Sequence, residues 1–254
     1  MKRLITLTLF LLAGFSSMAA NTELDSLKQK LQTITVDSLK GNVYQQIAEE
    51  YLKYDTIKHR GVKLYYQSEA LNYTMLALHN YSYYTDTLGM RTCFNYLAKV
   101  YSSQGKYSQA KWFMLQSNKI SRDRQDVPNI ITSLVDLSMI KMSNNDYKLA
   151  MRDLNEALTL STKSSSPELE ALVQKNYAFL YNRMKDYEKG DLAAKRAEEL
   201  YEKIKMDGET TATVIKPAPE SAKAKKAALA AKKKSLMATK KMIKASNAKR
   251  LASL

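Results

Sequence analysis

The sequence predicts an all-α fold in which helical hairpins stack into a solenoid. Three observations lead to this prediction. Gly and Pro are scarce, at 7 and 4 of the 254 residues, which favours long helices over turn-rich sheets. Three segments (QGKYSQA, NNDYKLA and MKDYEKG) align without gaps and place Tyr107, Tyr147 and Tyr187 at a spacing of 40 residues. Small residues recur at fixed distances from these tyrosines, as closely packed helices require.

Residues 1–19 are expected to be a secretory signal peptide. Lys2 and Arg3 precede an apolar stretch at 4–15, which is too short to span a bilayer. Ser17 and Ala19 are small residues at the two positions that a signal peptidase recognises, which predicts cleavage after Ala19. An uncleaved N-terminal anchor is the alternative. The mature protein is therefore expected to be soluble and to lie in the periplasm or outside the cell.

A leading helix and a degenerate first repeat are expected next. Residues 20–41 contain leucines at positions 24, 27 and 31, a helical spacing. The degenerate repeat at 42–81 has Ala48 and Ala70 as the small residues of its two helices. The interval between these two alanines is much longer than that between Ala98 and Ala110 of the next repeat. The difference predicts an insertion around 54–65.

Three further repeats are expected at 90–123, 128–163 and 167–206. Gly105 and Asn145 suit the left-handed backbone of a tight helix-to-helix turn. Lys185 stands at the third equivalent position and does not suit it, which predicts that the last turn is built differently. Ser166 and Pro167 form a helix-start signal. The expected helices are 42–56, 61–83, 90–104, 106–123, 128–144, 146–163, 167–184 and 186–206.

The best-preserved repeat reads Phe94-x-x-Leu97-Ala98-x-x-Tyr101, continuing through Gly105, Tyr107 and Ala110. This pattern resembles the tetratricopeptide repeat (TPR) family, and the resemblance covers about residues 42–205. The family's usual period is about 34 residues, so longer helices or loops are expected here. A generic helical solenoid is the alternative. The resemblance implies a right-handed superhelix that binds a protein or peptide partner in a concave groove.

The same resemblance implies which residues line that groove, because in this family the first helix of each pair faces it. Asparagine and cationic side chains at these positions loosely resemble a clamp for a peptide's terminal carboxylate. Asp136 puts a negative charge where such a clamp needs an amide, and methionine makes the centre apolar. A mixed apolar and polar groove is therefore favoured over a dedicated clamp. The candidate residues are Asn95, Lys99, Asp136, Met139, Lys175, Asn176, Phe179, Asn182 and Arg183.

No pattern for catalysis or for a cofactor is found. His59 and His79 are far apart in the sequence and Cys93 is the only cysteine, so zinc-ligand spacing is absent. The chain also lacks a glycine-rich phosphate loop and a nucleophile elbow. The sequence therefore predicts a non-enzymatic protein without a cofactor. Cys93 is interpreted as a small buried helix residue.

The C-terminal region differs in composition from the repeats. Residues 208–220 contain Gly208, Pro217 and Pro219 and are expected to be a linker. The tail at 221–254 is rich in Lys and Ala, which are good helix formers. Of the net charge of +15, residues 208–254 hold twelve Lys or Arg against Glu209 and Glu220. The lysines that carry this polycation include Lys225, Lys226, Lys232, Lys233, Lys234, Lys240 and Lys241.

Three partners suit such a tail: anionic lipid, a cell-wall polymer or an acidic protein. A nucleic acid is also compatible with a polycation, but the predicted export argues against it as a partner. The main functional hypothesis is an exported interaction scaffold. The alternative is a sensory subunit, because the signal, leading helix and 40-residue repeats also resemble the input regions of TPR-containing bacterial sensor kinases. No membrane span or signalling domain follows the repeats here, so a sensor would act through a membrane partner.

Overall fold

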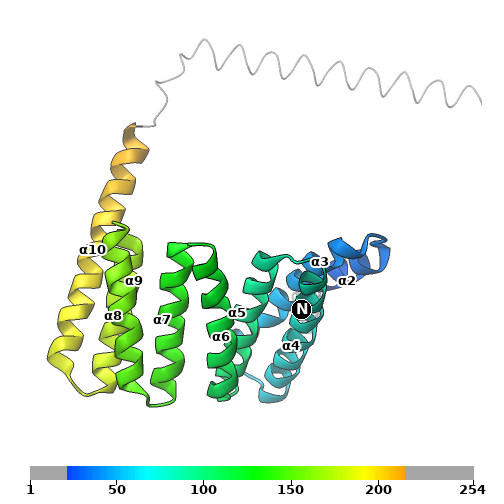
Figure 1. The fold of residues 1–254 in the computed structure, drawn as a ribbon, viewed down its shortest axis with the longest axis horizontal. Coiled ribbons are helices and arrows are strands. Elements are labelled where there is room, and N and C mark those ends of the chain that lie inside the picture. The colour runs from blue at the N-terminus through cyan, green and yellow to red at the C-terminus, as the bar shows by residue number, and fades with distance from the viewer. Residues whose placement is uncertain (1–21, 215–254) are drawn as a thin grey trace, which may run out of the picture. The chain divides into compact units, whose positions relative to one another are not determined.

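The computed structural model describes the backbone of residues 22–214 and the side chains of residues 23–206. Within this range every regular element is a helix, which confirms the all-α prediction (Figure 1). The chain divides into two compact units, residues 1–204 and 205–254. Only the helical segment 205–214 of the second unit is described. The predicted signal peptide and the lysines of the predicted tail lie outside the described residues.

The first part of the solenoid consists of α2 (Thr22–Thr33), α3 (Asp37–Tyr51) and α4 (Arg60–Tyr83). The leading helix is shorter than expected, because α2 ends at Thr33 and α3 already begins at Asp37. The leucines of α2 and Ile34 pack against a buried cluster that contains Val43 and Ile47 of α3. A short 3-10 helix, η1 (Leu52–Thr56), follows α3. The extra residues foreseen in this hairpin form η1, the link that follows it and a longer α4.

The second part is far more regular. Five successive helices have 17 residues each, and short connections of equal length separate every neighbouring pair. This regular alternation explains the long period of the repeat, which spans two helices and two connections. The last helix continues beyond the expected end at 206 and into the predicted linker, whose first proline is Pro217. These elements are α5 (Thr87–Ser103), α6 (Tyr107–Asp123), α7 (Val127–Ser143), α8 (Tyr147–Lys163), α9 (Pro167–Arg183) and α10 (Tyr187–Val214).

One turn geometry joins all these helices. The second residue of each connection has a positive φ, from 53° to 73°. In the α5–α6 turn, the backbone N–H of Lys106 donates to the Tyr101 carbonyl and that of Gly105 to the Ser102 carbonyl. This pair of bonds satisfies carbonyls that the helix end would otherwise leave unpaired. The residues with positive φ recur at one constant interval and are Thr85, Gly105, Gln125, Asn145, Ser165 and Lys185.

The expectation of a different last turn was wrong. Lys185 has φ +63°, and the N–H of Asp186 donates to the Tyr181 carbonyl at 2.9 Å, as in the other turns. A lysine can occupy this conformation at a cost of about 1–2 kcal/mol. The hydrogen bonds of the turn and the packing of Ala193 against the α9 core therefore determine the geometry, and the residue type only tunes its stability.

The small residues predicted at helix crossings are buried. Ala98 and Ala110 are both 0% exposed and belong to one cluster with Met114 of α6. A side chain of this size lets two helix axes approach to about 8–10 Å. The predicted packing of the hairpins is therefore confirmed. Ala150 and Ala178 are buried at the equivalent places in later repeats, and Ala157 and Ala197 are buried at the place that Ser117 has in the second repeat.

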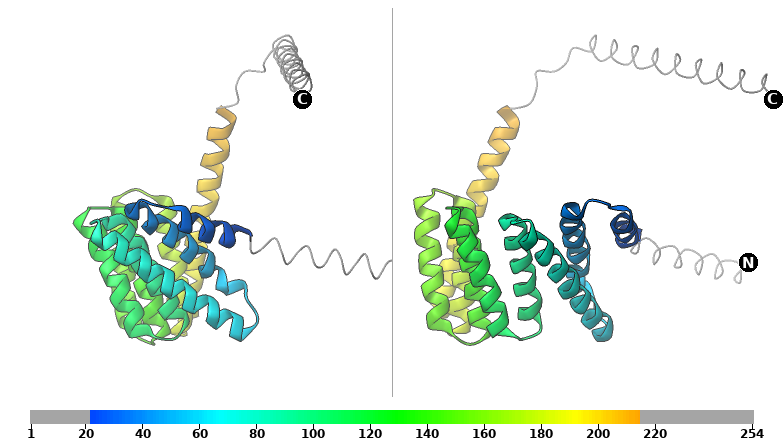
Figure 2. Two further views of the ribbon diagram at one scale, coloured as in Figure 1. Left: turned by 90° about the vertical axis from the view of Figure 1, so that its right-hand side faces the viewer. Right: turned by 45° about the vertical axis from the view of Figure 1, so that its right-hand side comes forward.

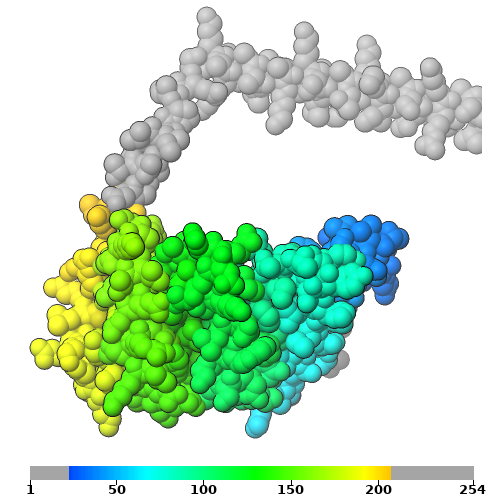
Figure 3. All heavy atoms as spheres, in the orientation of Figure 1, coloured from blue at the N-terminus to red at the C-terminus, as the bar shows by residue number. Residues whose placement is uncertain are grey.

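The hairpins of the first unit follow one another in chain order. Each helix from α2 to α9 packs against its sequence neighbours, and the first helices of adjacent hairpins also meet, α3 with α5 and α7 with α9 (Figures 1 and 2). The space-filling view shows the same order as successive bands of colour (Figure 3). This neighbour-only packing is the architecture of a repeat solenoid.

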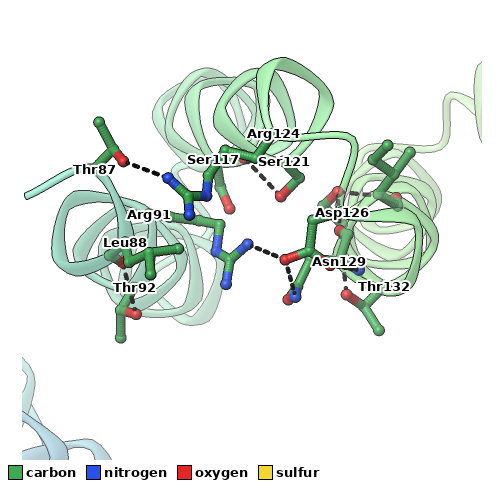
Figure 4. Close-up of polar contacts among 12 residues, drawn as sticks. Thr87, Leu88, Arg91, Thr92, Ser117, Ser121, Arg124, Asp126, Asn129 and Thr132 are labelled. Atoms are coloured by element: carbon green, nitrogen blue, oxygen red, sulfur yellow. Dashed lines mark hydrogen bonds and ion pairs between the residues drawn. The ribbon is translucent and has the colours of Figure 1, made fainter.

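The connection between α6 and α7 carries an ion pair to the preceding hairpin (Figure 4). Arg91 Nη1 of α5 donates to Asp126 Oδ2 at 2.6 Å, and Arg124 reaches Thr87 at 3.4 Å. Asp126 Oδ1 also accepts a hydrogen bond from the N–H of Asn129, so Asp126 caps the N-terminus of α7. The bond from Arg91, together with those from Asn129, lowers the pKa of Asp126 below its usual value. The ion pair between Arg91 and Asp126 thus fixes the start of α7 relative to α5.

Candidate functional site

A cavity of about 580 Å³ lies between the first helices of the second and third repeats. α5 and α7 approach each other less closely than α7 and α9 do. The sequence explains the difference, because α5 carries Arg91 and Asn95 where α7 carries Ile131 and Val135. The two α7 residues join a buried apolar cluster that includes residues of α9. Polar residues at the same places in α5 cannot form such a continuous core, so the space between α5 and α7 stays open.

Four of the nine predicted groove residues line this cavity. α5 contributes Asn95 and Lys99, and α7 contributes Asp136 and Met139. Met139 is 49% exposed, so its side chain is available to a ligand in the cavity. Asn95 Oδ1 is buried and has no hydrogen-bond partner among the described residues. The remaining lining residues are Tyr54, Asp55, Tyr96, Ala98, Ser102, Ser103, Met114 and Ile140.

Lys99 is engaged at the end of the cavity formed by η1. Its Nζ lies 3.5 Å from Asp55 Oδ2 and 5.7 Å from the centroid of the Tyr54 ring. The Tyr54 hydroxyl in turn donates to the Lys99 carbonyl at 3.4 Å. The ammonium group therefore already has an anionic and an aromatic neighbour. This arrangement leaves it poorly disposed to act as half of a carboxylate clamp.

Asp136 of α7 is an acidic residue that lines the cavity. It is exposed to solvent and makes no hydrogen bond or ion pair within residues 23–206. The surrounding helices nevertheless remove part of its hydration, and this desolvation raises its pKa to about 6. The carboxyl group thus sits in surroundings that disfavour its charge and offer no counter-ion.

The five predicted residues of α9 do not line this cavity. Lys175, Phe179, Asn182 and Arg183 are exposed on α9, with Phe179 52% exposed. Asn176 is only 4% exposed, and its Nδ2 donates to the Leu172 carbonyl at 2.8 Å. A ligand therefore cannot reach Asn176 as it stands. The predicted groove is divided into a hollow at α5 and α7 and an exposed surface on α9.

A second cavity of about 440 Å³ adjoins the start of α4 and the α5–α6 turn. Three cationic residues line it, Arg60, Lys63 and Lys106, together with Leu64, Gln67, Ser103 and Gln104. No carboxylate among the described residues pairs with these three cations. Sequence reasoning missed this site, because Arg60 and Lys63 lie in the hairpin whose extra residues break the repeat alignment.

Tyr54 and Asp55 of the first cavity were missed for the same reason. They belong to η1, which has no counterpart in the other repeats, so no repeat position could place them. Met114 and Ile140 were recognisable as core residues only, and the structure shows that they also line the cavity. The one available signal was the insertion near Tyr54, which marked an irregular segment without giving its location.

Other kinds of site are not evident in the described part of the chain. Residues 23–206 contain no group of three His, Cys, Asp or Glu side chains arranged to hold a metal ion. No helix within the described range is both long and apolar enough to cross a membrane. Cys93 is fully buried, and burial raises the pKa of its thiol to about 12.

Solved structures show which fold this arrangement belongs to. BtubC (BKLC) from P. vanneervenii matches with a TM-score of 0.59 at 16% identity, over 80% of this chain and 79% of that one. A putative kinesin light chain from Podosopora anserina with nearly identical TPR-like repeats matches with a TM-score of 0.59 at 13% identity, over 74% and 90%. A variant of the latter gives 0.60 at 13% identity, over 75% and 91%.

The fold is a TPR-like helical solenoid. No protein-family model matches the sequence, and no curated protein matches it. The TPR-like hairpins are therefore identified by their three-dimensional arrangement at an identity too low for a sequence match. The absence of a match to a family model agrees with the long period of the repeat. Two helices of 17 residues with their connections exceed the family's usual unit of about 34 residues.

Proposed function

We propose that this protein is an exported, non-enzymatic scaffold that binds a segment of a partner protein in the cavity between α5 and α7. The single observation that carries the proposal is this 580 Å³ cavity, with half-exposed Met139 and unpaired Asp136 at its wall. Its size is in the range of specific ligand sites. TPR-like solenoids present such surfaces to protein partners, which supports a macromolecular ligand over a small metabolite.

Site-specific photo-crosslinking tests the cavity as the binding surface. Benzoylphenylalanine is placed at Met139 in the full chain, and as a matched control at Leu149, which is 41% exposed on α8 and lines neither cavity. We expect a defined adduct with a partner protein from Met139 only. Equal adducts from both positions, or none from Met139, would reject the proposal.

Export is part of the proposal and rests on the N-terminal sequence. Fractionation and N-terminal sequencing of the protein from its native cell should give a mature chain that begins at Ala20 outside the cytosol. A cytosolic chain that retains Met1 would contradict this part. It would leave the cavity proposal intact, because the two rest on different residues.

The polycationic tail is proposed to attach the scaffold to an anionic surface. Residues 208–254 hold twelve of the forty Lys and Arg residues, with two acids among them. Sedimentation with vesicles that contain anionic lipid, with and without residues 208–254, tests this. We expect binding that needs the tail and declines as salt rises. Binding that persists without the tail would exclude electrostatic attachment through it.

A further inference from the structure

The formal charges around the cavity leave one uncompensated acid. Three ionised groups line the cavity, Asp55, Lys99 and Asp136. Lys99 lies 3.5 Å from Asp55, so these two offset each other. Asp136 has no counter-ion and no hydrogen-bond donor among the described residues. The local negative charge therefore lies at Asp136.

Part of the lining beside Asp136 is apolar. Met139 and Ile140 follow it on α7, and Met114 of α6 lies on the same cavity. These side chains can contact an aliphatic chain, and methionine adapts its shape readily to a ligand. Asn95 of α5 adds an acceptor, since its Oδ1 forms no hydrogen bond that a ligand would have to replace. The cavity thus places one unpaired acid beside the apolar side chains of Met114, Met139 and Ile140.

We propose that this cavity receives a lysine or arginine side chain of the partner segment, with the cationic group on the Asp136 carboxylate. The inference rests on the proposed function and specifies its ligand chemistry. The aliphatic stem of the incoming side chain lies along Met139 and Ile140, and its charged end forms the charge-assisted hydrogen bond that Asp136 lacks. The pairing offsets the cost of desolvating that carboxylate.

The same geometry argues against a terminal carboxylate as the ligand. A carboxylate in this cavity meets two like charges, Asp55 and Asp136, and only one cation, which Asp55 already pairs. Like charges in partly desolvated surroundings repel strongly. The specificity is therefore the opposite of the clamp suggested by the family resemblance.

Selection from a random peptide library tests the proposal through ligand chemistry alone. Twelve-residue peptides displayed on phage are selected on the full-length protein and on the Asp136→Asn variant. The control variant is Asp123→Asn, which removes an exposed acid that lines neither cavity. We expect peptides with a Lys or Arg next to apolar residues on the wild type and on the control, and loss of this enrichment on Asp136→Asn.

The affinity of the most enriched synthetic peptide gives the quantitative result. We expect about a 10- to 100-fold loss on Asp136→Asn, as for one charge-assisted hydrogen bond. Enrichment of acidic peptides, or equal affinity for wild type and Asp136→Asn, would overturn the inference while the groove remains a binding site. If no selected peptide shifts the methyl resonance of Met139, the proposed function fails and the inference fails with it.

Discussion

Lys141 of α7 and Asp153 of α8 form a buried ion pair inside the third repeat, with side chains only 7% and 6% exposed. One repeat earlier, the same two positions are Tyr101 and Phe113, whose rings stack with centroids 5.4 Å apart and planes 5° apart. One place in the hairpin is therefore filled by an aromatic stack in one repeat and by a salt bridge in the next. The two repeats share the contact but not its chemistry.

The difference between these two repeats predicts that single and double substitutions at residues 141 and 153 have different effects on stability. Lys141→Ala or Asp153→Ala should each cost about 3–5 kcal/mol of unfolding free energy, because each removes one member of the buried pair. After Lys141→Ala, only the exposed Arg152 remains beside the acid, 3.8 Å from Asp153 Oδ1. The double variant with Tyr at 141 and Phe at 153 copies the neighbouring repeat and should be closer to the wild type than either single variant. Urea unfolding followed by circular dichroism measures this.

Glu156→Ala is the matched control for these variants. Its carboxylate pairs with Arg122 at 2.7 Å in an exposed pair, which should contribute at most about 1 kcal/mol. A double variant less stable than both single variants would show that the ion pair is required by its surroundings. It would also refute the equivalence of the two positions.

The turns predict a stabilising substitution. Lys185 has φ +63° and is exposed, so Lys185→Gly removes backbone strain without removing a buried contact. After the entropy that Gly gains in the unfolded chain is subtracted, we expect a gain of about 0.5–1 kcal/mol. In the same unfolding assay, Lys195→Gly, an exposed position within α10, should lose about 1 kcal/mol. Equal destabilisation by both would contradict the assigned turn geometry.

Cys93 should be chemically inert in the folded protein. It is 0% exposed, and burial raises the pKa of its thiol to about 12, so thiolate is scarce at neutral pH. Ellman's reagent should label it only after the protein is unfolded in urea. The exposed-residue variant Ser108→Cys supplies the positive control on α6. Labelling of native Cys93 at the rate of the control would show that the packing between α4 and α5 opens readily.

The raised pKa of Asp136 predicts a pH dependence of stability. Its folded value of about 6 lies above the usual 3.8, so between these values the folded state binds more protons than the unfolded state. The contribution of this group to stability is therefore greatest below about pH 4 and declines as pH rises to about 6. Asp136→Asn should remove this decline. The difference in unfolding free energy between wild type and variant, measured from pH 4 to 7, should grow in favour of the variant; a constant difference would refute the shift.

Much of the fold could be predicted because small residues and tyrosines repeat in a fixed register. Ala98 and Ala110 had to be buried for the hairpin to close, and the structure confirms both. The turn at Lys185 was mispredicted because residue preference was given more weight than the hydrogen bonds that shape the turn. The equal spacing of all the connections was visible only once the backbone was known.

The candidate site could be predicted only in part, for a physical reason. Asn95, Lys99, Asp136 and Met139, which the resemblance to the TPR family placed on the groove, do line one cavity. Asn176 was predicted to line the groove, but it is buried. Its burial depends on packing against neighbouring helices, which the position in the repeat does not determine. The contrast between Asn95 and Val135 at equivalent positions was present in the sequence and would have located the open space between α5 and α7.

The cavity between α5 and α7 is the proposed binding place of a cationic side chain. The most direct test is the measurement of intermolecular nuclear Overhauser effects between the Met139 methyl group and a selected lysine-containing peptide on the full-length protein. We predict effects from the methylene protons of the peptide lysine to Met139, and their loss in Asp136→Asn. A peptide that binds wild type and Asp136→Asn with the same affinity, and whose contacts lie elsewhere, such as on the exposed face of α8, would contradict this prediction.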